Sequence, residues 1–195
     1  MKRERMLRVL LNEPSGNLTK YRLSKLAECS REWVIEFLKK LEAQGLVKGT
    51  RVVNYNKLIG YWHRVRLESE HIGYMLREPL ELLRKAELAY ALTTYQAENL
   101  IQHYLFPSRT DIYILEGDRA KWHSLIVNAG GLVGNGNLRA LLSDKHVFYK
   151  ATKHRGLVVV SMPQLAVDLL EEGGPCVEAA QLLIEKVTRH AVPAS

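Results

Sequence analysis

Short helical segments separated by turn signals fill residues 1–55, and their spacing constrains the fold more than any other feature of the chain. Apolar side chains recur at helical spacing in residues 3–12, 19–27 and 30–44. The boundaries carry residues that favour the beginning or the end of a helix, namely Pro14, Gly16, Thr19, Ser30 and Gly45. Residues 46–53 then predict two short strands around a glycine. The pattern therefore predicts three helices followed by a hairpin.

The excess positive charge of the chain is confined to the same segment. Of the 28 Lys/Arg and 21 Asp/Glu residues, residues 1–55 hold 12 and 6, a net of +6. Residues 56–195 hold the other 16 and 15, a net of +1. This asymmetry favours a polyanion-binding domain at 1–55 attached to a nearly neutral domain at 56–195. A solvated basic surface without a partner is the alternative that charge alone leaves open.

The order of helix, helix, short turn, helix and hairpin resembles the winged helix-turn-helix family. Two stretches carry the resemblance: Leu23-Ser24-Lys25-Leu26-Ala27, and Leu41-Glu42-Ala43-Gln44-Gly45-Leu46-Val47 at the end of the capped third helix. The resemblance implies double-stranded DNA as the partner, with the third helix in the major groove. The other interpretation is a helical hairpin used only for protein contacts.

On the DNA-binding interpretation, the third helix reads bases, and its neighbours bind phosphates. The candidate base-reading residues are Ser30, Arg31, Glu32, Glu36, Lys39 and Lys40. The candidate phosphate-binding residues are Lys20, Arg22, Lys25, Lys48 and Arg51. An arginine can pair with guanine, and a glutamate can accept a hydrogen bond from cytosine. Glutamates are unfavourable beside phosphates, however, so docking of this helix on a protein stays an alternative.

Residues 56–195 predict a mixed α/β domain, because the strand candidates are too irregularly spaced for a doubly wound sheet. The predicted strands are 62–68, 110–115, 132–133, 138–142, 147–149 and 157–161, with 132–133 and 138–142 paired in a hairpin through Asn135-Gly136. The predicted helices are 79–92, 95–104, 120–128, 164–171 and 177–187. The expected fold class is therefore α+β, with the winged helix-turn-helix first.

Two segments near the end of the chain are the most distinctive: Ser161-Met162-Pro163-Gln164-Leu165-Ala166-Val167-Asp168-Leu169-Leu170, and Gly173-Gly174 followed by Glu178-Ala179-Ala180. With them, residues 56–195 resemble the C-terminal domain of AbiEi-type antitoxins of type IV toxin–antitoxin systems. The resemblance implies an autorepressor that counters a nucleotidyltransferase-like toxin encoded beside it. A helix-turn-helix protein that reads palindromes is usually a dimer, so a homodimer is a further expectation.

The residues of the first of these segments also have a structural interpretation. Ser161 is placed to cap a helix, and Gln164 and Asp168 lie one helical turn apart on one face. They could hold a loop in place or bind a partner. A structural role for Gln164 and Asp168 is favoured, because nothing in the spacing points to a particular ligand.

No catalytic arrangement is recognisable, so we predict neither an enzyme nor a metal or cofactor. The glycine cluster 130–136 lacks the Gly-Lys-Ser/Thr of a P-loop and opens no long helix. Asp111 has no second carboxylate two residues on, and Ser161 lacks the Gly-x-Ser-x-Gly elbow of a hydrolase. Two alternatives to a plain regulator stay open: one that responds to a small molecule, and an enzyme fused to a DNA-binding module.

Composition suggests where the protein works. The only two cysteines, Cys29 and Cys176, are far apart and favour a reducing compartment. No apolar stretch approaches the roughly 18 residues that span a bilayer, and residues 1–5 show no secretory signal. We therefore expect a cytoplasmic DNA-binding transcriptional regulator.

Overall fold

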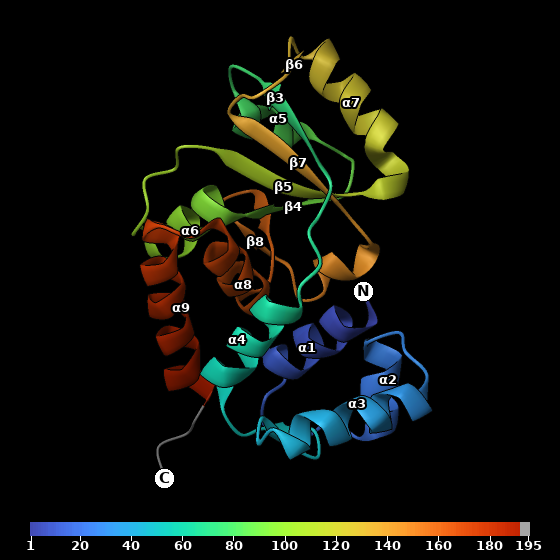
Figure 1. Ribbon diagram of the computed structural model, residues 1–195. Helices are drawn as coiled ribbons and strands as arrows, with labels where there is room; N and C mark the ends of the chain where they lie inside the picture. Colours follow the sequence, from blue (N-terminus) through green and yellow to red (C-terminus); the bar gives the residue numbers. More distant parts are fainter. Residues whose placement is uncertain (192–195) are drawn as a thin grey trace.

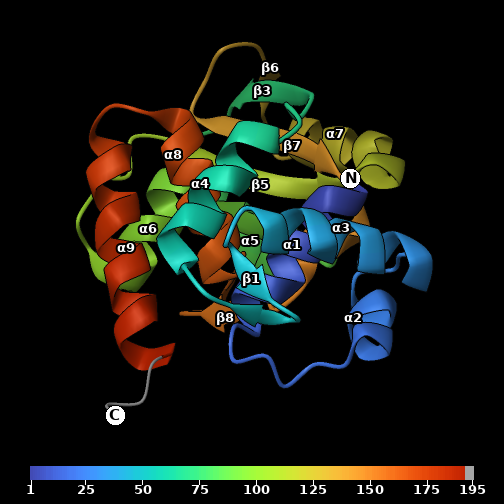
Figure 2. The same cartoon turned by 60° about the horizontal axis from the view of Figure 1, so that its bottom comes forward.

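The computed structural model describes residues 1–191, with side chains to residue 189, and has an α+β fold (Figure 1). The N-terminal part contains α1 (Lys2–Asn12), α2 (Lys20–Leu26), α3 (Arg31–Ala43), β1 (Val47–Lys48) and β2 (Arg51–Val52). The predicted three helices and hairpin are thus present. Figure 2 shows α2, α3 and the hairpin together on the outside of the molecule.

The helix ends in this part follow the predicted local signals. The hydroxyl of Thr19 accepts a hydrogen bond from the backbone N–H of Arg22 at 3.1 Å, and that of Ser30 accepts one from Trp33 at 3.3 Å. Gly45 follows α3 with φ +66°, the left-handed conformation that glycine adopts without strain. Because each signal acts within a few residues, the sequence alone locates these boundaries.

The other seven strands form one mixed sheet. They are β3 (His71–Met75), β4 (Tyr90–Thr93), β5 (Thr110–Leu115), β6 (Leu132–Val133), β7 (Leu138–Ser143), β8 (Thr152–His154) and β9 (Leu157–Val159). Their order across the sheet is β6-β3-β7-β5-β4-β9-β8. The central pair β5–β7 and the pair β4–β9 are parallel, and the remaining pairs are antiparallel.

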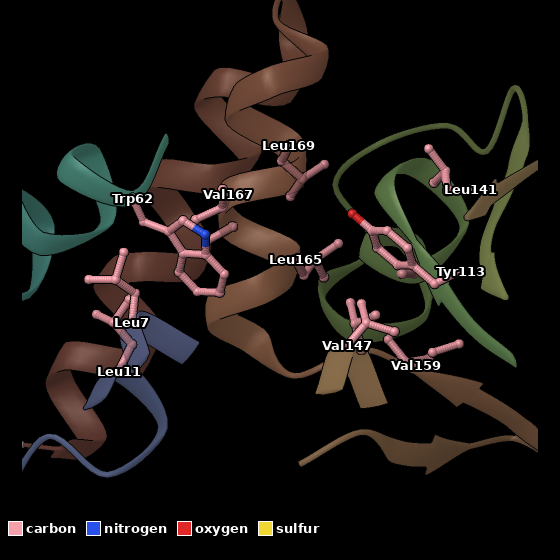
Figure 3. Packing of buried hydrophobic residues seen from close by; sticks show 14 of the residues in the cluster. Leu7, Leu11, Trp62, Tyr113, Leu141, Val147, Val159, Leu165, Val167 and Leu169 are labelled. Atoms are coloured by element: carbon pink, nitrogen blue, oxygen red, sulfur yellow. The ribbon is translucent and has the colours of Figure 1, made fainter. Parts of the chain in front are cut away.

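Helix α8 lies between the sheet and the N-terminal helices. The helices of this larger part are α4 (Tyr55–Val65), α5 (Pro79–Lys85), α6 (Thr94–Gln102), α7 (Arg119–Asn128), α8 (Met162–Glu172) and α9 (Pro175–Ala191), with 3-10 turns η1 (Glu116–Asp118) and η2 (Lys145–Phe148). In Figure 3, α8 has Tyr113 of the sheet on one side and Trp62 of α4 with Leu7 of α1 on the other. All three side chains are buried in one hydrophobic cluster, so α1 packs into the core of the larger part.

Two strand predictions are wrong. Residues 62–68 begin inside α4, because Asn54 caps that helix by accepting from the N–H of Lys57 at 2.9 Å, and its apolar residues up to Trp62 lie on one buried face. Residues 147–149 overlap η2, where Asp144 accepts from the N–H of His146 at 2.9 Å and begins a tight turn. Tertiary burial of Val147 thus outweighs its strand propensity.

Two further expectations change in detail. Strands β6 and β7 exist, but they pair with opposite edges of β3 and form no hairpin with each other. A Cβ on Gly136 would lie 2.2 Å from the carbonyl oxygen of Tyr74, so close packing on β3 requires this glycine. The predicted helix 79–92 ends at Lys85, and residues 90–93 form β4.

Candidate nucleic-acid interface and a buried polar network

All eleven residues predicted to contact DNA have exposed side chains. They lie on α2 (Lys20, Arg22, Lys25), at the start and along the outer face of α3 (Ser30, Arg31, Glu32, Glu36, Lys39, Lys40), and on the hairpin (Lys48, Arg51). The inner face of α3 is apolar and buried through Val34, Phe37, Leu38 and Leu41. Trp33 stacks on Phe37 with ring centroids 4.9 Å apart and so packs against this inner face.

The outer face of α3 carries no net charge. Three basic residues, Arg31, Lys39 and Lys40, are matched by three acidic ones, Glu32, Glu36 and Glu42. Lys39 Nζ lies 2.8 Å from Glu36 Oε1. This hydrogen bond raises the pKa of Lys39 and lowers that of Glu36, so both stay charged and compensate each other. Attraction for a polyanion must therefore come from the elements beside α3.

Those neighbouring elements are uniformly basic. Helix α2 and the hairpin strands contribute five basic side chains and no acidic one: Lys20, Arg22, Lys25, Lys48 and Arg51. Lys48 and Arg51 are directly opposite each other across the hairpin, so they extend from the same face of it. Both α2 and β1 pack against α3. The neutral helix is thus bordered by positive charge before and after it in the chain.

The hairpin is held in place by the segment between α1 and α2. The carbonyl oxygen of Pro14 accepts from the N–H of Val52 at 2.9 Å, and Ser15 forms a β-bridge with Arg51. The hydroxyl of Thr50 lies 2.6 Å from the carbonyl oxygen of Leu18. These contacts give the basic hairpin a defined position relative to α1.

Two arginines of the basic N-terminal segment do not belong to this surface. Arg8 is 4% exposed, and its Nε and Nη2 donate to Gln164 Oε1 at 2.8 and 2.6 Å. Arg5 donates through Nε and Nη2 to Asp144 Oδ2 at 3.0 and 2.8 Å. No local pattern distinguishes these arginines from DNA-binding ones, because Gln164 and Asp144 lie more than 130 residues away from them in sequence.

Gln164 and Asp168, singled out from the sequence, belong to a buried polar network on α8. Gln164 Nε2 donates to Asp168 Oδ1 at 2.8 Å, and Arg66 Nη1 donates to the same oxygen at 2.6 Å. The hydroxyl of Tyr113 also donates to it, at 2.9 Å. Burial alone would lower the pKa of Arg66, but the Asp168 carboxylate raises it. The network thus has the structural role favoured for these residues.

A second cluster surrounds Asp111, which is fully buried in β5. Arg109 and Arg139 each donate two hydrogen bonds to its carboxylate at 2.7–3.0 Å, and both also reach Glu172 of α8. The hydroxyl of Thr94 donates to Asp111 as well. Thr94 has φ +48°, an unfavourable conformation for a β-branched residue that this hydrogen bond helps to hold.

The two clusters line a polar cavity of about 250 Å³, to which Arg66, Thr94, Arg139, Asp168 and Glu172 contribute. Carboxylates do converge here, as the fused-enzyme alternative would require. The carboxylates that line it are Glu68, Asp168, Glu171 and Glu172. Asp168 and Glu172 are bound by arginine, as is Asp111 of the second cluster. Within the described part of the chain, no group of three His, Cys, Asp or Glu residues is placed to hold a metal ion.

Comparison with protein-family models, with curated proteins and with solved structures found no match to this chain. Within residues 1–191, no helix combines the length and the apolar character needed to cross a bilayer.

Proposed function

We propose that this protein is a DNA-binding transcriptional regulator and that residues 1–55 form a winged helix-turn-helix. The observation that carries the proposal is the set of five exposed basic side chains on α2 and the hairpin, the two elements that pack against α3. A surface of this kind binds a phosphate backbone on either side of a groove. Helix α3, with 13 residues and so about 20 Å long, lies in the major groove.

Base reading falls to the first turns of α3. Arg31 is the first residue of the helix and is free to place its guanidinium on a guanine edge. Glu32 accepts from a cytosine amino group. The ion pair with Lys39 offsets the repulsion between Glu36 and phosphates. Ser30, whose hydroxyl caps the helix, orients this end.

The larger part supplies protein contacts in this proposal, and the regulator is a cytoplasmic antitoxin-type autorepressor. The resemblance of residues 161–180 to AbiEi-type antitoxins supports this role and a functional link to a nucleotidyltransferase-like toxin. The sheet edge at β6 exposes apolar side chains, with Leu132 71% and Val133 62% exposed. Such an edge supports a protein partner, a second copy for a homodimer included.

The test is binding of the full chain to the DNA upstream of its own gene and to a scrambled duplex, followed by fluorescence anisotropy across a salt series. We expect preference for the native duplex and a loss of about tenfold or more in that preference for Arg31→Ala. Arg77→Ala is the matched control, because Arg77 is exposed in the connection between β3 and α5, at the other end of the molecule from α3 (Figure 1).

Equal, weak binding of both duplexes would contradict sequence-specific regulation and leave only a basic surface. Binding that Arg31→Ala leaves unchanged would remove α3 from the interface. In that case α3, with its balanced charges, would be assigned to protein docking instead.

A further inference from the structure

A cavity of about 530 Å³ lies where the end of α1, β8, the start of α8 and the end of α9 meet. Apolar side chains supply half of its lining residues: Leu11, Pro14, Met162, Pro163 and Val187. The volume falls within the range of about 300–1,000 Å³ that is typical of small-molecule sites. None of the eleven candidate DNA-contacting residues lines it. The cavity is therefore a separate site.

Hydrogen-bond donors gather in this cavity at the beginning of α8. Ser161 is the N-cap residue, yet no backbone N–H of the helix donates to its side chain, contrary to the predicted cap. Instead, the Ser161 hydroxyl accepts from Asn12 Nδ2 at 3.2 Å. The side chain is buried, and its O–H has no acceptor among the described residues. Pro163 has no N–H, so the first turn of α8 presents the uncapped amide of Met162 and a spare hydroxyl donor at the positive end of the helix dipole.

The charge of the lining also favours an anionic ligand. Lys150 lines the cavity, and among the described residues no carboxylate does. Lys150 Nζ lies 3.0 Å from Glu13 Oε1, but the lysine side chain is 55% exposed. An ion pair that solvent screens this strongly contributes little, so Lys150 can turn to another anion at low cost. Together these groups favour an anionic ligand over a neutral or cationic one.

We propose that this cavity binds a small amphiphilic carboxylate. Its carboxylate accepts from the Ser161 hydroxyl and the first turn of α8, with Lys150 nearby. Its hydrocarbon part packs along Leu11, Met162 and Val187. A short fatty acid combines an apolar chain with one negative charge and fits this division of the lining into apolar walls and a donor-rich end.

The position of the cavity makes the ligand a regulator of DNA binding. Pro14 forms part of the wall, and its carbonyl oxygen accepts from Val52 of the hairpin at 2.9 Å. A ligand that contacts Pro14 therefore contacts the segment that holds the basic hairpin. This coupling rests on the proposed function, whereas binding of the ligand does not. Linkage requires that each ligand change the affinity for the other by the same factor.

Calorimetric titration of the full chain with octanoate tests the binding. Octylamine has the same chain with the opposite charge, and acetate has the charge without the chain. We expect saturable binding of octanoate at one site per chain and at least tenfold weaker binding of both controls. Absence of octanoate binding, or equal binding of octylamine, would overturn the proposal.

The substitution Met162→Glu locates the site, because it adds a negative charge inside the cavity while an acidic residue in the first turn suits a helix. Met75→Glu, at an exposed position on β3, is the matched control. Octanoate binding should weaken at least tenfold for Met162→Glu and stay unchanged for Met75→Glu, with thermal unfolding in the absence of octanoate confirming that both variants fold. Unchanged binding by Met162→Glu would place the ligand elsewhere.

DNA affinity measured with and without saturating octanoate tests the coupling. We expect a change of at least fivefold in the wild type and none in Met162→Glu. Octanoate binding with unaltered DNA affinity would overturn the coupling alone. Octanoate binding in a protein that prefers no DNA sequence would contradict the proposed function and leave the carboxylate site intact.

Discussion

Arg8 of α1 holds one nitrogen of the His146 ring: its Nη1 lies 2.9 Å from His146 Nδ1. A guanidinium can only donate, so Nδ1 accepts and the ring proton is on Nε2. That nitrogen lies 2.9 Å from the carbonyl oxygen of Leu26, the last residue of α2. One neutral imidazole thus joins α1, α2 and η2. Burial and then the charge of Arg8 lower the pKa of His146.

The first prediction is a loss of stability in mild acid. The unfolded chain binds a proton on His146 at the ordinary pKa of about 6.5, while the folded ring resists protonation until lower pH. The free energy of unfolding should therefore fall as pH drops below about 6.5, by at most about 1.4 kcal/mol per pH unit from this group. Urea unfolding between about pH 8 and 5 measures the slope.

His146→Gln isolates the contribution of His146 to the pH dependence of stability, because glutamine keeps a donor and an acceptor that do not titrate. The variant should be less stable than the wild type at neutral pH but show a shallower slope in acid. His71→Gln, at an exposed position on β3, should leave the slope as it is. A slope unaffected by His146→Gln would show that other groups cause the acid sensitivity.

Removal of the charge of Asp111 should destabilise the fold strongly. Asp111→Asn leaves the guanidinium groups of Arg109 and Arg139 without their main counter-ion at a buried position. Breaking a buried ion pair costs about 3–5 kcal/mol. Asp118→Asn, which breaks an ion pair with the 68% exposed Lys121, should cost under about 1 kcal/mol. Chemical denaturation measures the free energy of unfolding of both variants. Similar losses in the two would contradict a structural role for the Asp111 cluster.

Gly136→Ala should disturb the edge of the sheet. The added methyl group would overlap the Tyr74 carbonyl on β3, so the segment between β6 and β7 must move away. Overpacking of this kind costs about 1–3 kcal/mol. Gly117→Ala is the control, since a Cβ there meets no atom within 4 Å. Amide hydrogen exchange should show faster exchange of β6 and β3 in Gly136→Ala only, and unchanged protection would refute the close contact.

Lys48→Ala should weaken binding to all DNA sequences alike, in contrast to Arg31→Ala. A hairpin lysine that contacts a phosphate contributes affinity without sequence information. Its loss should lower the slope of log affinity against log salt by about 0.9. Lys85→Ala, on α5, should leave both affinity and slope unchanged. A change of sequence preference in Lys48→Ala would show that the hairpin contacts bases and not only the phosphate backbone.

The parts of the fold that the sequence predicts are those with local signals. Thr19, Ser30 and Gly45 act within one helical turn of themselves, so α2 and α3 follow from a few residues. Periodicity alone also separates the inner face of α3 from the outer one. The six candidate DNA-contacting residues at the start and along the outer face of α3 are exposed for this reason.

What the sequence does not predict depends on distant partners. In the sequence, Arg8 resembles a DNA-binding arginine. In the structure it is buried and donates to Gln164, 156 positions away. Residues 147–149 have strand propensity, but the cap at Asp144 bends them into a 3-10 turn. The cavity beside Ser161 joins four elements that no short segment reveals.

The packing of α1 on α8 has a consequence for synthesis of the chain. The two partners of the Arg8–Gln164 hydrogen bond are 156 residues apart, and ribosomes add about 5–20 residues per second. Helix α1 therefore emerges roughly 8–30 s before the helix that covers its inner face. Parallel pairing of β4 with β9 waits roughly 3–13 s at the same rate, because Leu92 needs Val159. During that interval the nascent chain exposes the apolar face of α1. Ribosome-associated chaperones bind exposed apolar segments of this kind.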